Sequence, residues 1–109
     1  MPKSPKPGTP VRGSNTGRPI MALLDLLGRR WTLRAIWELH RKPLTFRDLQ
    51  TACGGISPTI LNTRLAELRD AGIVAQRDSG YTLTTEGERL LKELLGLHDW
   101  AERWAKRKA

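Results

Sequence analysis

The chain has 109 residues, 39% of them hydrophobic, and a formal net charge of +8. This length supports one domain with a modest core, and no run of about twenty apolar residues could span a membrane. The single cysteine excludes an internal disulfide framework, and His40 and His98 lie too far apart along the chain for a metal-ligand spacing. We therefore expect no cofactor and no metal. The positive charge favours a polyanion as partner, although basic ends can also serve solubility alone.

Residues 1–18 differ in composition from the rest of the chain. They are rich in proline, glycine, serine and basic side chains, so they offer little apolar surface to bury, and they lack the apolar stretch of a secretion signal. We expect a disordered basic tail over residues 1–18, a single domain over residues 19–109, and a cytoplasmic, nucleoid-associated protein.

Residues 19–28 predict the first helix of the domain. Pro19 suits the first helical position, and Gly28 suits a helix end. The positions expected to face inward are Met21, Leu24 and Leu27, or alternatively Leu23 and Leu26. Few polar positions remain, so this helix must be covered on nearly all sides, either by its own domain or by a second copy of the chain.

A second helix is predicted to begin at Thr32, as its N-cap, and to end before Pro43. Its apolar side is formed by Leu33, Ile36, Trp37 and His40. We expect Trp31 and Trp37 to lie in the core, where indole rings bury a large apolar area. On the same apolar side, His40 is expected to be a packed histidine.

A third helix is predicted between Thr45 and Gly54. Thr45 and Asp48 resemble a capping box with the shorter acid. The inward positions of this helix are Phe46, Leu49 and Cys53. Because Cys53 continues this apolar stripe, we expect a small buried side chain rather than a reactive thiol.

The stretch from residue 57 to residue 72 predicts a fourth helix with two different faces. Ser57 is a suitable N-cap, Pro58 suits the first turn, and Gly72 ends the helix. One face is apolar and carries Ile60, Leu61, Leu65 and Leu68. The other face carries short or amide-bearing side chains, namely Thr59, Asn62, Thr63, Ala66 and Arg69. Such a face lets a helix enter the major groove of DNA and contact base edges, although it can also be a merely solvated surface.

The third and fourth helices are joined by a glycine-containing turn, which is typical of a helix-turn-helix whose second helix is presented to DNA. The residues expected to contact bases are Ser57, Pro58, Thr59, Asn62, Thr63 and Ala66. The residues expected to contact the DNA backbone are Arg29, Arg30, Arg47, Arg64, Arg69 and Arg77. Arg64 lies beside the leucine stripe, so it either binds phosphate or braces the fold.

Two short extended segments, 73–77 and 81–83, follow the fourth helix. The residues between them, Asp78 to Gly80, are a turn signal, so the segments predict a small hairpin. A hairpin at this place is the wing of a winged helix, and Arg77 is its only cation.

Residues from about 85 to 107 predict a long final helix, capped by Thr84 or Thr85. Its leucines and tryptophans recur at alternating spacings of four and three residues, as in a heptad seam. This apolar surface exceeds what one small domain covers, so we expect it to pack on the first helix of a second copy; packing on its own core is the alternative. The residues expected at the dimer interface are Met21, Leu24, Leu90, Leu94, Leu97, Trp100, Ala101 and Trp104.

A family resemblance rests on three stretches: LLGRRWTLRAIWEL (26–39), LTFRDLQTACGGISPTILNTRLAELRDAGIV (44–74) and YTLTTEGERLL (81–91). In this order and spacing they resemble the HxlR-type winged helix-turn-helix regulators of bacteria, a branch close to the MarR regulators. The resemblance implies a mainly α fold with a small β-wing and a dimer built from the first and last helices. It also implies a two-fold related operator, with residues 57–70 in the major groove and the wing near the minor groove.

The sequence departs from the family pattern in two respects. Members typically carry a cysteine directly before the proline that opens the first helix, whereas this chain has Arg18 before Pro19. The redox or electrophile sensing of some members is therefore not implied here. The wing lacks several residues of the usual hairpin, so contacts to the DNA backbone are expected to shift from the wing towards the basic tail, residues 1–18.

We predict a sequence-specific regulator that binds double-stranded DNA as a homodimer on an inverted repeat, with room for an unknown small-molecule effector between the dimer helices and the winged domain. The alternative is a winged-helix module for protein interaction, with only nonspecific nucleic-acid binding. The balance of two arginines and two acids on the fourth helix, together with the short wing, supports this alternative. An enzyme is not expected, because the chain offers no nucleophile set, phosphate loop or paired acids.

Overall fold

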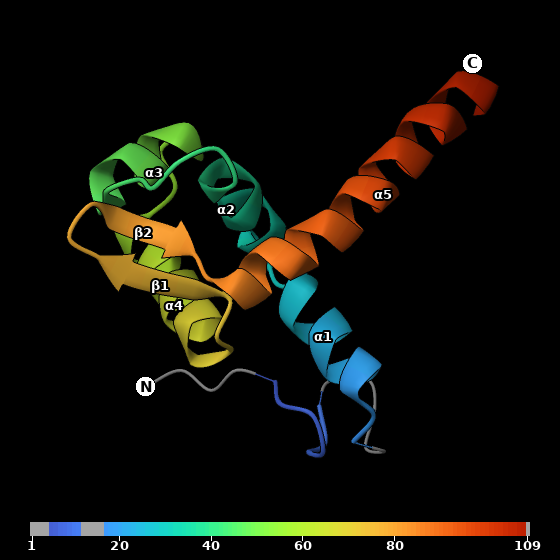
Figure 1. The fold of residues 1–109 in the computed structure, drawn as a ribbon, viewed down its shortest axis with the longest axis horizontal. Coiled ribbons are helices and arrows are strands. Elements are labelled where there is room, and N and C mark those ends of the chain that lie inside the picture. Colours follow the sequence, from blue (N-terminus) through green and yellow to red (C-terminus); the bar gives the residue numbers. More distant parts are fainter. Residues whose placement is uncertain (1–4, 12–16, 109) are drawn as a thin grey trace.

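The computed structural model describes residues 5–11 and 17–108. In chain order the elements are α1 (Pro19–Leu27), α2 (Thr32–Leu39), α3 (Phe46–Ala52), α4 (Pro58–Asp70), β1 (Val74–Arg77), β2 (Gly80–Leu83) and α5 (Thr85–Lys108). The predicted fold class, mainly α with a small β-wing, is confirmed (Figure 1). Among the described helices, none is both long and apolar enough to cross a membrane.

The core lies where α2, α3 and α4 meet the hairpin. Its fully buried side chains include Ile36, Leu49, Leu61, Leu65 and Leu68. The leucines of α4 therefore form the buried stripe that the sequence predicted. Ile60, which was expected beside them, is 39% exposed instead, because it points about 100° away from its neighbour Leu61 around the helix and so lies at the edge of the buried stripe.

Three of the helix starts are capped by side chains. The Thr45 hydroxyl accepts a hydrogen bond from the Asp48 amide at 3.1 Å, and the Ser57 hydroxyl accepts one from the Ile60 amide at 3.4 Å. At the start of α5 it is Thr84, rather than Thr85, that accepts from the Gly87 amide, at 3.0 Å. These bonds satisfy amides that have no partner within their own helix, which fixes where each helix begins.

The start of α2 differs from the prediction. Trp31, not Thr32, is the N-cap, and it has a left-handed backbone with φ 78°. Thr32 is already helical, and its side chain is fully buried. The helix also ends at Leu39, one turn earlier than expected from Pro43.

The buried face of α2 is rotated towards its smallest residue. Ala35, Ile36 and Leu39 are buried, whereas Leu33 is 44% exposed and Trp37 is 38% exposed. The expectation that Trp37 lies in the core is therefore wrong for the single chain. Close packing on the core selects the side that carries the small Ala35, and this places the bulky indole at the edge.

The hairpin is a short antiparallel pair in which Val74 pairs with Leu83 and Arg77 with Gly80. The linker before α3 joins it, because Leu44 and Tyr81 exchange backbone hydrogen bonds of 3.0 and 2.7 Å. Gly80 has φ 116°, and a Cβ there would lie 2.4 Å from the Leu44 carbonyl oxygen. Only glycine allows this approach, which holds the predicted wing against the body.

The final helix is covered at its start and open towards its end. Leu90, Leu91 and Leu94 pack against the core. Beyond them, α5 projects away from the body, and α1 leaves the body in a different direction (Figure 1). At the point of departure, the His98 ring stacks on the Trp37 indole, with 5.5 Å between centroids.

The described residues of the tail are 5–11 and 17–18, and the first of these segments makes local and tertiary contacts. The Thr9 amide and hydroxyl both bond to the Lys6 carbonyl, and the Lys6 ammonium lies 3.5 Å from Asp70 at the end of α4. Residues 1–4 and 12–16, on which much of the prediction of disorder rests, lie outside the described residues. That prediction therefore stays open.

Candidate nucleic-acid interface

The turn between α3 and α4 fixes the relation of the two helices. Gly54 and Gly55 both have left-handed backbones, with φ 77° and 81°. The Gln50 side chain, on α3, donates to the Ile56 carbonyl at 2.9 Å, across the turn. The result is a helix-turn-helix in which α4 is the second helix, as the sequence predicted.

The face of α4 opposite its leucines is open at the N-terminal end. Ser57, Pro58, Thr59 and Asn62 are exposed, whereas Thr63 and Ala66 are partly buried. The six residues predicted to contact bases thus follow one side of the first turns of α4. Ile60, which the sequence placed on the buried face, is exposed in the same turns, and its branched apolar group is of the kind that can meet a thymine methyl.

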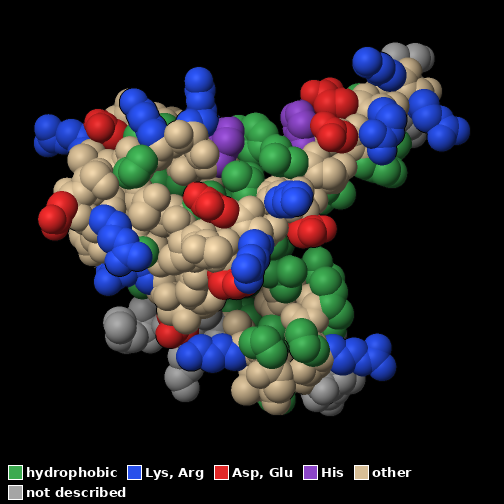
Figure 2. All heavy atoms as spheres, in the orientation of Figure 1, with side chains coloured by type: hydrophobic (Ala, Val, Ile, Leu, Met, Phe, Trp, Pro, Cys, Tyr) green, Lys and Arg blue, Asp and Glu red, His purple; other side chains and the backbone are tan. Residues whose placement is uncertain are grey.

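Four of the six arginines predicted to contact the DNA backbone are exposed. They are Arg30, Arg47, Arg69 and Arg77. The Arg30 guanidinium lies 5.6 Å from the centroid of the Trp31 ring, a cation–π contact that holds the charged end of this side chain beside the indole. Figure 2 shows Lys and Arg side chains distributed over the face of the body that carries the wing and α3.

The other two arginines are used within the fold. Arg29 donates to one carboxylate oxygen of Glu67 and lies 3.5 Å from Asp25, and Arg64 donates at 2.8 Å to the other oxygen of Glu67. The Nε of Arg64 also donates to the Arg30 carbonyl at 2.8 Å. Of the two roles that the sequence allowed for Arg64, bracing of the fold is the one seen.

Glu67 itself was not singled out from the sequence. Its side chain is 5% exposed, although it was counted only as a surface charge that balances the arginines of α4. Its position next to Leu68 was no signal of burial, because consecutive helical residues point about 100° apart and Arg69, the other neighbour of Leu68, is exposed. The partner from outside the helix, Arg29, could not be found from spacing along α4.

Further exposed apolar side chains lie on α1 and on the outer part of α5, two helices that leave the body in different directions (Figure 1). Leu24, Leu97, Trp100 and Trp104 are 50–61% exposed, and Ala101 is exposed beside them. Met21 is partly buried, and Leu90 and Leu94 pack against the chain's own core. The predicted dimer residues therefore fall into an open group and a covered group. Ile20, Leu33, Trp37 and Leu95 are also exposed.

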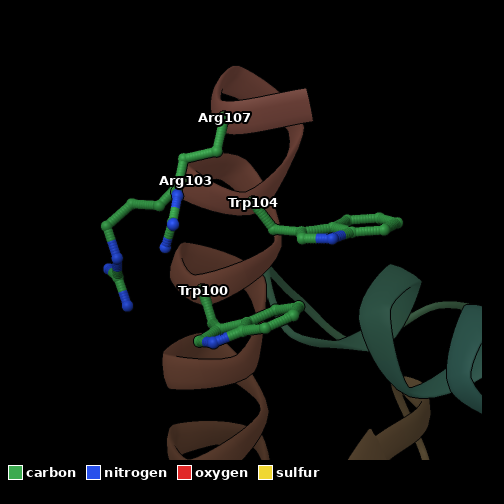
Figure 3. A pocket seen from close by; sticks show the side chains of 4 residues that line it. All are labelled: Trp100, Arg103, Trp104 and Arg107. Atoms are coloured by element: carbon green, nitrogen blue, oxygen red, sulfur yellow. The ribbon is translucent and has the colours of Figure 1, made fainter. Parts of the chain in front are cut away.

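The tip of α5 presents its aromatic and basic side chains in different directions. The indoles of Trp100 and Trp104 stack with 5.9 Å between centroids and extend to the same side of the helix (Figure 3). Arg103 and Arg107 extend to the other side (Figure 3). The hollow that these four residues line is thus a shallow feature of one helix rather than an enclosed ligand site.

Cys53 is buried at the end of α3, with 1% of its surface exposed, as predicted. Burial raises the pKa of its thiol; nearby Arg34 lowers the pKa and Glu38 raises it, each by a smaller amount. The thiolate is therefore disfavoured. Within the described ranges, no three His, Cys, Asp or Glu side chains form a group that could hold a metal ion.

Comparisons with known proteins agree with this geometry. A model of the HxlR-like helix-turn-helix family matches residues 26–109. The HTH-type transcriptional regulator YvaP of Bacillus subtilis is 29% identical over 89 residues, which cover 74% of this chain and 82% of YvaP.

Two solved structures are similar in fold as well as in sequence. The quinone-bound YodB of Bacillus subtilis superposes with a TM-score of 0.71 at 30% identity, covering 77% of this chain and 94% of that one. A MarR-family regulator of Enterococcus faecalis V583 superposes with a TM-score of 0.76 at 28% identity, covering 91% and 96%. Both matches extend over most of the winged domain.

Proposed function

Since the chain belongs to the HxlR-like helix-turn-helix family, whose members are DNA-binding transcriptional regulators, we propose that it is a homodimer that binds an inverted-repeat operator through α4. The observation that carries this proposal is the exposed face at the start of α4. There, small and amide-bearing side chains lie on a helix whose opposite face is locked into the core. A helix of this kind can enter the major groove without steric conflict.

Base contacts are assigned to the open turns of α4. Asn62 and Thr63 offer hydrogen-bonding groups to base edges, with Ser57, Pro58, Thr59 and Ala66 close to the DNA beside them. Backbone contacts are assigned first to Arg30, Arg47, Arg69 and Arg77, because these four residues are exposed. Arg29 and Arg64 are a lesser part of the proposal, since carboxylates inside the fold already use their guanidinium groups.

The second copy is assigned to the open surface of α1 and α5. Two exposed tryptophans and exposed leucines on a projecting helix form an apolar surface that a single small domain leaves uncovered. Tryptophan is the residue type most enriched at the energetic centres of protein interfaces. A two-fold dimer would also place two copies of α4 on one side of a duplex, about one helical turn apart. Such a regulator acts where the DNA lies, in the cytoplasm at the nucleoid.

Selection of random duplex DNA by the purified protein, at about physiological salt, tests the proposal. We expect enrichment of an inverted repeat with half-sites roughly one helical turn apart, and an affinity that falls steeply as salt rises. Recovery of DNA without enrichment would reject the regulator and favour an interaction module that binds nucleic acid nonspecifically.

Substitutions then test α4 as the helix that contacts bases. Asn62→Ala together with Thr63→Ala should weaken operator binding by roughly 1–3 kcal/mol for each lost base contact, while binding to random duplex stays unchanged. Thr85→Ala makes the same chemical change at an exposed position of α5 and should leave both affinities unchanged. An equal loss of specific and nonspecific binding in the double variant would contradict the assignment.

A further inference from the structure

A buried charged cluster connects α4 to the end of α1. Each carboxylate oxygen of Glu67 accepts from a different guanidinium, one from Arg29 and the other from Arg64 at 2.8 Å. Arg29 also lies 3.5 Å from Asp25 of α1. The cluster thus bridges two elements that the proposed function assigns to different tasks, dimer formation and DNA contact.

The four side chains of the cluster are mostly buried. Asp25 and Glu67 have side chains 5% exposed, and Arg29 and Arg64 have side chains 20–23% exposed. Two acids and two bases leave no net charge, which is the condition under which ionised groups remain inside a protein. Charge-assisted hydrogen bonds to two fixed guanidinium forks also restrict the orientation of the carboxylate more tightly than a single bond does.

The turn between α1 and α2 is held by the same side chains. Arg64 donates to the Arg30 carbonyl at 2.8 Å, and the next residue is Trp31, with its left-handed φ of 78°. A tryptophan keeps such a conformation only where its surroundings impose it. Helix α4 therefore has a defined position relative to a turn that is itself constrained.

We propose that Glu67 is a positioning residue for DNA recognition, which fixes the orientation of α4 relative to α1 through Arg29 and Arg64. The inference rests on the proposed function, because it assigns the DNA-contacting role to α4. Pro58 lies nine residues before Glu67, which is about 13 Å along the helix axis. A small tilt at Glu67 therefore displaces the base-contacting turns of both copies, and with them the distance between the two half-sites.

The first measurement needs no DNA. Spin labels on Arg18→Cys and Arg69→Cys, both at exposed positions, report the distance between the start of α1 and the end of α4. Samples diluted with unlabelled protein isolate the distance within one chain, and the buried Cys53 stays unlabelled. We expect one narrow distance distribution for the parent and a broadened or shifted one for Glu67→Gln. Glu86→Gln, which breaks the exposed Arg89–Glu86 pair of 2.7 Å within α5, is the matched control and should leave the distribution narrow.

The second measurement uses the selected operator and random duplex of equal length, at a temperature where circular dichroism shows all variants folded. Glu67→Gln should lower the ratio of specific to nonspecific affinity at least tenfold. It should also flatten the preference among operators whose half-sites are moved one or two base pairs closer or further apart. Ile36→Val changes a fully buried side chain that makes none of the cluster's hydrogen bonds or ion pairs, so it controls for lost stability and should keep both the ratio and the spacing preference.

The outcomes separate the two levels of the inference. A parent protein with no preference for any duplex would reject the proposed function, while the distance distribution would still decide whether Glu67 orients α4. An unchanged distribution and an unchanged specificity ratio in Glu67→Gln would overturn the positioning role. If Glu67→Gln does not fold, Asp25→Asn gives the same test from the α1 side, because it removes one carboxylate and leaves the Arg64–Glu67 pair of 2.8 Å in place.

Discussion

Helices α4 and α5 have similar leucine periodicity but differ in how much of the leucine stripe is buried. In α4, Leu61, Leu65 and Leu68 are at most 1% exposed. In α5, the stripe is packed against the core only as far as Leu94, and Leu97 is 61% exposed. The free face of α4 is polar and small, whereas the free face of α5 is aromatic.

The difference shows what a periodic apolar pattern determines and what it leaves open. Periodicity states that a face must be covered, because exposed apolar area is unfavourable in water. It does not state which molecule covers that face. For α4 the cover is the chain's own α2 and β1, with Leu49 of α3 in the same buried cluster, whereas for the outer half of α5 no described part of the chain supplies one. We assign that cover to a second copy.

The largest expected effect comes from a substitution in the covered stripe. Leu65→Ala removes a side chain that is 1% exposed and leaves a cavity between α4 and the core. The free energy of unfolding should fall by about 2–5 kcal/mol. Urea denaturation followed by circular dichroism measures this loss, and an effect below 1 kcal/mol would mean that the core can collapse around the gap.

A substitution in the open stripe should act on association instead. Trp100→Ala removes an indole that is 53% exposed in the single chain. We expect the dimer dissociation constant to rise about ten- to thirtyfold, equivalent to roughly 1.4–2 kcal/mol, as for an aromatic residue near an interface centre. Sedimentation equilibrium over a range of concentrations measures the change.

The control for this experiment is Glu93→Ala, on the same helix. Glu93 is exposed and carries a charge rather than an apolar group, so its loss should leave dimer formation unchanged. A parent protein that stays monomeric at every concentration would remove the second copy from the proposal. In that case a different partner would have to cover α5.

The sequence predicted those features that depend on local chemistry. Each of these features follows from the residue at its position and that residue's near neighbours. They are the caps at Thr45 and Ser57, the proline-led starts of α1 and α4, and the turn before Gly80. The stripe of α4 was predicted equally well, because leucines at helical spacing leave little choice of inward face. The open polar face of α4 followed directly from that stripe.

Features that depend on contacts between distant residues were not predictable. Trp37 was expected in the core, but the close approach of other elements to Ala35 turned the indole outwards. The pairing of Arg29 with Glu67 joins residues that are 38 positions apart, and nothing in either local sequence indicates it. From the sequence, Arg29 was therefore assigned to DNA and Arg64 was left between phosphate binding and bracing of the fold, whereas in the structure both pair with Glu67.

The smallest expected effect concerns Cys53, which lies in the same core as the α4 leucines. Burial raises the pKa of its thiol, so the folded state favours the protonated form. This contribution to stability is complete below the pKa of the unfolded thiol and is lost as pH rises through the higher pKa of the folded one. Near neutral pH, below the pKa of the unfolded thiol, the stability of the protein should therefore not vary with pH through the titration of Cys53.

Alkylation of Cys53 by iodoacetamide measures how well that core stays closed. At mildly alkaline pH, labelling of the folded protein should be at least about a hundredfold slower than labelling in urea, because the thiol reacts only when the structure opens. Leu65→Ala should accelerate the reaction, since the cavity lowers the free energy of opening. Trp100→Ala should leave the rate unchanged at concentrations where the parent and the variant are both folded. Fast labelling of the parent protein would contradict a closed core around α4. Acceleration by Trp100→Ala would instead show that the surface of α5 and the core of α4 are coupled, and that the second copy stabilises the winged domain as well as positioning it.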